Sequence, residues 1–278
     1  MIIKFMSSGP NTDTVSLLEC YPDLQINYIE TLLEIERKKR EHPVPLNLKL
    51  KYLELKCNFD PDQVVKILNR YSFPLDESLK ICKTHQRHLA VAHITYRLGL
   101  TEEAVQEYLS IIQMSFDSYL HGMGMERAQI ERLVSDAQFC FKMVLGICLD
   151  MAKQNEVGYK ELFETFLNFV IESYLNLRKK DVYDTTNIEV LVKISELSRY
   201  VKDCFIEKLM IHYAQEVGTA EIVEIIDYNP LMRALQLKDY KGIIRFLTFE
   251  RKIMKDITSI CGEGQRQYKA KYISKVVS

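Results

Sequence analysis

The sequence of 278 residues has no tryptophan, ten glycines and seven prolines. Glycine and proline interrupt helices more than other residues do, so their scarcity leaves long stretches that can be helical. Leu, Ile, Glu, Lys and Met, which lose little free energy on entering a helix, are plentiful in those stretches. No alternating, strand-like pattern of any length occurs. The composition predicts an all-α protein whose bulky core side chains are Tyr and Phe.

Long apolar runs are also missing. No window approaches the roughly 20 apolar residues that a membrane-spanning helix needs. Residues 1–10 lack the apolar stretch of a secretory signal. We therefore expect a cytoplasmic protein that reaches a membrane surface only through its partners.

The cysteines form no C-x-x-C pair and are odd in number, which does not suit a disulfide framework. Several fall on apolar helical faces, so we expect buried thiols in a reducing compartment. The seven positions are Cys20, Cys57, Cys82, Cys140, Cys148, Cys204 and Cys261.

Signatures of catalysis are absent from the sequence. There is no G-x-S-x-G elbow and no G-x-x-x-x-G-K-[ST] loop, and Gly262 and Gly264 form a G-x-G without a preceding strand. The acidic pairs Glu102–Glu103 and Asp60/Asp62 fit helix N-termini, where the helix dipole favours negative charge. We expect no enzyme activity, no catalytic residue and no cofactor.

Four potential zinc ligands lie close together in the sequence, and thiolate and imidazole groups are the usual ligands of this metal. Their spacing does not place them on one helical face, which favours ordinary surface and inter-helix roles and no metal. The four residues are Cys82, His85, His88 and His93. An aromatic stripe, Phe163, Phe166 and Phe169, suits a groove for a partner helix or a packed core, and the core is favoured.

Charge is distributed unevenly along the chain. Residues 1–228 hold 26 Lys+Arg against 34 Asp+Glu, a net −8, and residues 229–278 hold 11 against 4, a net +7. A basic segment attracts acidic proteins, anionic lipids or nucleic acid, but a solvated helix face or a packing surface for the acidic body is the favoured explanation. Its basic and aromatic residues carry no known nucleic-acid module, so no nucleic-acid partner is expected. They are Arg266, Tyr268, Lys269, Lys271, Tyr272 and Lys275.

The spacing of helix-stop signals gives the architecture. Residues 46–113 read as short helices joined by loops of near-constant length, a rhythm typical of a solenoid in which each helix pair packs on its neighbours. Longer helices are predicted over 125–154, 159–180, 187–199 and 201–217, with further helices to 260. We predict an α-solenoid of stacked antiparallel helix pairs over 15–260, a flexible leader over 1–14 and a basic, frayed tail over 261–278.

Several motifs resemble a known family. Tyr21–Leu33 carries a Y-P-x-L-Q-x-x-Y-[IL] pattern, and Tyr52–Val64 reads Y-L-E-L-K-C-N-F-D-P-D-Q-V. Leu75–Cys82 fits L-x-E-x-L-x-[IL]-C, and a helix pair over Ala90–Val105 follows it. These stretches resemble the class C vacuolar-sorting tether subunits of the CORVET and HOPS complexes, whose solenoids are related to clathrin heavy-chain repeats.

The resemblance implies a scaffold that acts in vesicle tethering and fusion on endosomal or vacuolar membranes. It implies other tether subunits and a Rab-type GTPase as partners, with contacts through exposed loop tips and inter-helix ridges. Members of the family also carry an N-terminal β-propeller and a C-terminal RING module. Neither can be placed here, so we expect a fragment, a truncated product or a divergent paralogue. The alternatives are a coat or intraflagellar-transport scaffold and a lipid- or nucleic-acid-binding basic tail.

Overall fold

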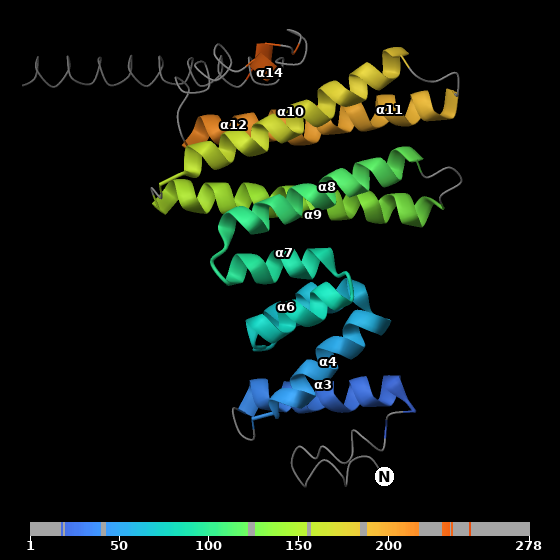
Figure 1. Ribbon diagram of the computed structural model, residues 1–278, viewed down its shortest axis with the longest axis vertical. Helices are drawn as coiled ribbons and strands as arrows, with labels where there is room; N and C mark the ends of the chain where they lie inside the picture. Colours follow the sequence, from blue (N-terminus) through green and yellow to red (C-terminus); the bar gives the residue numbers. More distant parts are fainter. Residues whose placement is uncertain are drawn as a thin grey trace, which may run out of the picture. The chain divides into compact units, whose positions relative to one another are not determined.

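The computed structural model describes residues 18, 20–39, 43–121, 126–154, 157–183, 188–216, 230–233, 235 and 245. Within these ranges every regular element is a helix (Figure 1), which confirms the all-α prediction. In chain order the elements are α3 (Pro22–Lys39), α4 (Leu46–Phe59), the short 3₁₀ helix η2 (Pro61–Gln63), α5 (Val64–Arg70), α6 (Leu75–Thr84), α7 (His88–Arg97), α8 (Thr101–His121), α9 (Arg127–Gln154), α10 (Tyr159–Tyr183), α11 (Ile188–Tyr200), the π-helical segment η3 (Val201–Ile206), α12 (Glu207–Glu216) and α14 (Pro230–Arg233).

The chain divides into two compact units. Unit 1 comprises residues 1–115 and 126–144, and unit 2 comprises residues 116–125 and 145–278. Each unit contains part of residues 15–260, for which the sequence predicts one continuous α-solenoid. The predicted leader, the predicted helix over 219–228, the predicted tail and, apart from residue 245, the predicted helix over 240–260 lie outside the described residues.

The first two helices that the structure describes in unit 1 form an antiparallel pair. α3 starts at Pro22, whose fixed φ and missing N–H suit the first turn of a helix, and α4 packs against it. Lys49 pairs with Glu36 at 2.8 Å. Lys56, about two helical turns further along α4, approaches Glu30, which precedes Glu36 in α3, at 4.0 Å. Because the later lysine of α4 pairs with the earlier glutamate of α3, the two helices run antiparallel. Between the helices lie fully buried side chains, among them Ile29, Leu33, Tyr52 and Leu53.

The middle of helix α7 is covered on all sides within unit 1. Six consecutive residues, from Ala90 to Thr95, are buried, so no face of this stretch is left to solvent. A helix that is buried all round must lie between neighbours. α5 and α6 pack against α7, and the buried Tyr108 of α8 interacts with both Tyr96 of α7 and Cys140 of α9. Successive helices of this unit therefore form layers.

Two helices of unit 1 end in the same hydrogen-bond pattern with different residues in the critical position. After α6, the Gln86 N–H donates to the Lys83 carbonyl at 3.1 Å and the Arg87 N–H donates to the Cys82 carbonyl at 2.9 Å. After α7, Gly99 donates to Tyr96 at 2.9 Å and Leu100 to Thr95 at 3.2 Å. Both are Schellman motifs, which require a left-handed residue just past the helix. Gly99 supplies it with φ 83° and Gln86 with φ 55°.

Because the left-handed conformation is costly for a residue with a Cβ, the two positions should respond in opposite ways. Gln86→Gly is expected to raise the free energy of unfolding by about 0.5 kcal/mol, since relief of strain exceeds the added freedom of the unfolded chain. Gly99→Ala is expected to lower it by about 1 kcal/mol through backbone strain alone, because a Cβ there would meet nothing within 4 Å. Urea unfolding followed by circular dichroism measures both changes, and equal signs would contradict this account.

Unit 2 is built around α10, which packs against α11, η3, α12 and α14. The sequence predicts separate helices over 187–199 and 201–217, but residues 188–216 are helical throughout, with a π-helical segment in the middle. Inside this segment Phe205 is buried, with its ring 5.4 Å from Tyr200 and 6.0 Å from Phe116. No Gly or Pro interrupts residues 188–216. The π-helical segment over residues 201–206 lets the helix continue without a break.

Two other predicted boundaries differ from the structure. α8 does not end near Gln113 but continues to His121, because buried residues such as Phe116 and Leu120 extend its apolar face. The helix predicted from Pro61 starts instead as the 3₁₀ helix η2 before α5 begins at Val64.

Candidate functional site

The four candidate zinc ligands do not form a site. In the part of the chain that the structure describes, no three His, Cys, Asp or Glu side chains are grouped so that they could hold a metal ion. Cys82 is buried and forms a hydrogen bond with Cys57. His93 is buried beside Asn69, and His88 is exposed. The structure thus gives these residues separate environments.

His93 joins α7 to α5. Its Nε2 lies 2.8 Å from Asn69 Oδ1, and the neighbouring Arg97 donates to the Leu68 carbonyl at 2.8 Å. Burial, together with the charge of Arg97, lowers the pKa of His93. The imidazole is therefore neutral at neutral pH and donates its Nε2 proton to Asn69. This arrangement fixes one helix against another and leaves no reacting atom exposed.

The densest polar network of unit 1 surrounds Glu34 of α3. The Tyr71 hydroxyl donates to Glu34 Oε1 at 2.6 Å, and Arg70 and Arg37 approach the carboxylate at 2.7 and 3.1 Å. The Tyr71 hydrogen bond and the two guanidinium groups lower the pKa of Glu34 from 4.5 to about 2. The Tyr71 ring in turn meets the buried Tyr52 ring edge-on at 6.2 Å. The network joins α3 to the end of α5 and is structural.

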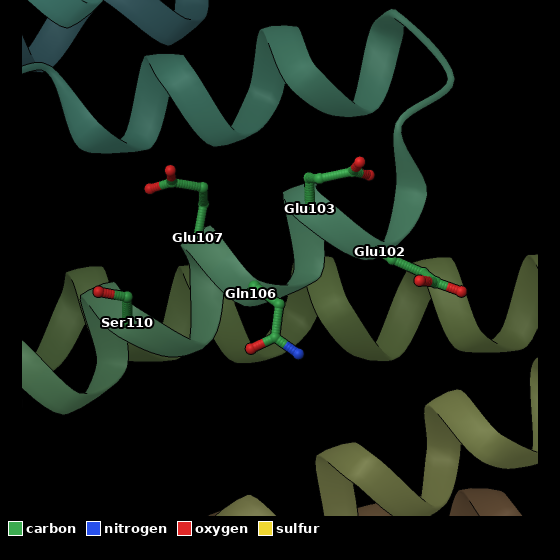
Figure 2. Close-up of a pocket in the computed structure, with 5 residues that line it drawn as sticks. All are labelled: Glu102, Glu103, Gln106, Glu107 and Ser110. Carbon is green, nitrogen blue, oxygen red and sulfur yellow. The ribbon is translucent and has the colours of Figure 1, made fainter.

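A polar hollow lies along the exposed face of α8 near its N-terminus. It has a volume of about 500 Å³. Figure 2 shows that the side chains that line it all project from this one helix: Glu102, Glu103, Gln106, Glu107 and Ser110. Glu102 and Glu103 occupy the first turn, as the sequence predicts from the helix dipole. The face is acidic, and the residues that line it include neither a histidine nor a cysteine.

The other acidic pair is also explained by neighbouring charges. Asp60 lies 3.3 Å from Lys56 at the end of α4, and Asp62 of η2 forms an ion pair with Arg132 of α9. These residues serve packing within unit 1.

The aromatic stripe of α10 belongs to the core of unit 2. Phe163 and Phe166 have no exposed surface, and Phe169 is partly buried. The preference for a core over a partner groove is confirmed for the two fully buried rings. Four of the cysteines are buried as expected, namely Cys57, Cys82, Cys140 and Cys148.

Large apolar side chains are exposed at one end of the α3–α4 pair. Tyr21 is 62%, Leu24 46% and Phe59 57% exposed. The antiparallel pairing brings the start of α3 to the end of α4, so the three residues lie at the same end of the hairpin. All three belong to the motifs that resemble tether subunits. Their exposed side chains can contact another protein, whereas Cys57, which belongs to the same set of motifs, is buried.

Sequence reasoning did not find the Glu34 network or the Cys57–Cys82 contact. Glu34 and Tyr71 are 37 residues apart, and no local pattern links residues at such a distance.

Comparison with known proteins adds no further constraint: no protein-family model, no curated protein and no solved structure matches this chain. Among the described helices, none combines the length and apolar character that crossing a membrane requires.

Proposed function

We propose that this chain is a protein-binding scaffold, an α-solenoid of antiparallel helix pairs without a catalytic site of its own. The observation that carries the proposal is the packing within unit 1, in which the buried middle of α7 lies against the preceding helices α5 and α6, and Tyr96 of α7 interacts with Tyr108 of the following helix α8. Such nearest-neighbour packing is the principle of solenoid proteins. The pairing of α10 with α11 in unit 2 is in keeping with it.

Within this class we propose a subunit of an endosomal or vacuolar tethering complex of the CORVET type. The support is the set of motifs over about residues 21–113, which resembles the solenoid of vacuolar protein sorting-associated protein 8. In this role the chain binds other tether subunits and a Rab-type GTPase. It lies peripherally on endosomal or vacuolar membranes, and partners hold it there.

Affinity purification of the tagged chain from its own cells, followed by mass spectrometry, tests this proposal. Co-purification of the shared class C tether subunits is the expected result. A coat or ciliary-train complex in their place would contradict the tether role and favour the alternative scaffold class. Recovery of no stable partner would also contradict it.

The exposed end of the α3–α4 pair offers a way to locate the contact. We expect the triple variant Tyr21→Ser, Leu24→Ser, Phe59→Ser to reduce recovery of the tether subunits at least about tenfold, because exposed aromatic and aliphatic residues contribute much of an interface's free energy. Val192→Ser, at a residue of α11 that is 50% exposed, is the matched control. Unchanged recovery with a normally folded triple variant would place the contact elsewhere.

A further inference from the structure

Two cysteines from different helices meet inside unit 1. Cys57 lies near the end of α4 and Cys82 near the end of α6, two helices that pack against each other. Both residues have no exposed surface, and neither is in a disulfide. Ser78, four residues before Cys82, is also fully buried. Small side chains on this face of α6 allow a close approach to α4 and bring the two thiols together.

The thiol pair has a defined electrostatic setting. The thiols of Cys57 and Cys82 are joined by a hydrogen bond, and the positive charge of Arg87 acts on both. The Schellman motif holds Arg87 in place, since its N–H donates to the Cys82 carbonyl at 2.9 Å. Its Nε is buried and makes no hydrogen bond to any described residue. A guanidinium group held in this way favours a thiolate nearby.

The two thiols are not equivalent. The hydrogen bond from Cys82, with the charge of Arg87, lowers the pKa of Cys57. The same hydrogen bond and burial raise the pKa of Cys82. Cys57 is therefore the more acidic of the two thiols, and Cys82 is the proton donor of the pair.

We propose that Cys57 and Cys82 form a redox-active dithiol that a small peroxide oxidises reversibly to a disulfide, which links α4 to α6. The oxidant that we propose is hydrogen peroxide, a small reagent suited to thiols without exposed surface. This modification site is independent of the scaffold role and stands or falls separately from it.

The chemistry balances in two steps. The Cys57 thiolate attacks one oxygen of hydrogen peroxide, the O–O bond breaks, and the products are a Cys57 sulfenic acid and hydroxide, which takes up a proton to give water. The sulfur of Cys82 then attacks the Cys57 sulfur. The S–O bond breaks, the Cys82 proton leaves with the departing hydroxide as a second water, and the disulfide forms. Two electrons pass from the dithiol to the peroxide, and a dithiol reductant returns them.

The chain contains an internal comparison. Cys140 and Cys148 of α9 have no exposed surface either, and burial raises the pKa of both thiols. They are eight residues apart on one helix, a rise of about 12 Å, which is beyond the reach of a disulfide. These two thiols therefore serve as buried controls that cannot form a disulfide with each other.

The test treats the full chain with hydrogen peroxide at neutral pH, blocks remaining thiols with an alkylating reagent and maps the peptides without reduction. The expected result is a disulfide-linked pair of peptides that contain Cys57 and Cys82, and dithiothreitol should separate them. Cys140 and Cys148 are expected to stay reduced and therefore to be found alkylated. Oxidation spread over all buried cysteines, or no linked peptide at concentrations that oxidise the exposed Cys20, would overturn the proposal.

Variants at Arg87 test the electrostatic part. Arg87→Gln is expected to slow formation of the linked peptide about three- to tenfold, because the thiolate fraction falls about tenfold for each pKa unit. Arg87→Lys, which keeps the charge, is expected to restore most of the rate. Circular dichroism of both variants monitors folding. In Cys57→Ala the linked peptide must be absent and Cys82 must stay reduced, and equal rates in the two Arg87 variants would contradict the role of the charge.

Discussion

Phe166→Ala is expected to lower the free energy of unfolding of unit 2 by about 3–5 kcal/mol, the largest effect of any single substitution considered. The ring of Phe166 has no exposed surface in the core around α10. Truncation removes its transfer free energy and leaves a cavity that the neighbouring helices fill only in part. Urea unfolding monitored by circular dichroism measures the loss.

Phe139→Ala is the control, because this ring of α9 is 37% exposed. A substitution there removes less buried surface, so we expect a cost of about 1 kcal/mol or less. If Phe166 belonged to a groove for a partner helix, the variant would keep its stability and lose a partner instead. That outcome would contradict the core assignment.

Glu34→Gln is expected to cost about 1–3 kcal/mol at pH 7, since it weakens the hydrogen bond from the buried Tyr71 and both guanidinium contacts at once. The contacts are those to Tyr71 at 2.6 Å and Arg70 at 2.7 Å. Urea unfolding of the variant beside the native chain measures the cost. The matched control is Glu54→Gln, because Glu54 pairs with Lys51 while both side chains are about 40% exposed. Exposed pairs of this kind contribute about 0.5 kcal/mol or less.

The same residue predicts how stability depends on pH. The pKa of Glu34 is lowered from 4.5 to about 2 in the folded protein. The unfolded chain therefore binds the proton first as the pH falls. The contribution of Glu34 is fully present above about pH 5 and is lost between pH 4.5 and 2. Unfolding measured over that range should show a shallower decline for Glu34→Gln than for the native chain, and parallel curves would contradict the assignment.

Much of the helical organisation could be predicted because its signals are local. α6 matches its predicted bounds, Leu75–Thr84, since Pro74 and the acidic first turn mark its start and a change to polar residues marks its end. α3 and α10 agree to within a few residues for the same reason. The boundaries that failed lie where tertiary packing outweighs local signals, as at Phe116 in α8 and Phe205 in the π-helical segment.

The contacts between helices could not be predicted in the same way. The spacing of Cys82, His85, His88 and His93 describes positions along one stretch of chain, whereas their environments depend on residues from α4 and α5. Cys82 meets Cys57 and His93 meets Asn69, and neither contact has a sequence signature.

The sequence by itself determined that this protein is helical and roughly where most of its helices begin and end, because helix propensity, capping and apolar periodicity act over a few neighbouring residues. Only the tertiary structure decided which thiols meet, which carboxylate carries the polar network and which apolar residues stay exposed. Those outcomes depend on how helices that are distant in the chain cross. The free energy of packing two helices depends on the side chains of both contacting faces, so the sequence of one segment does not determine it.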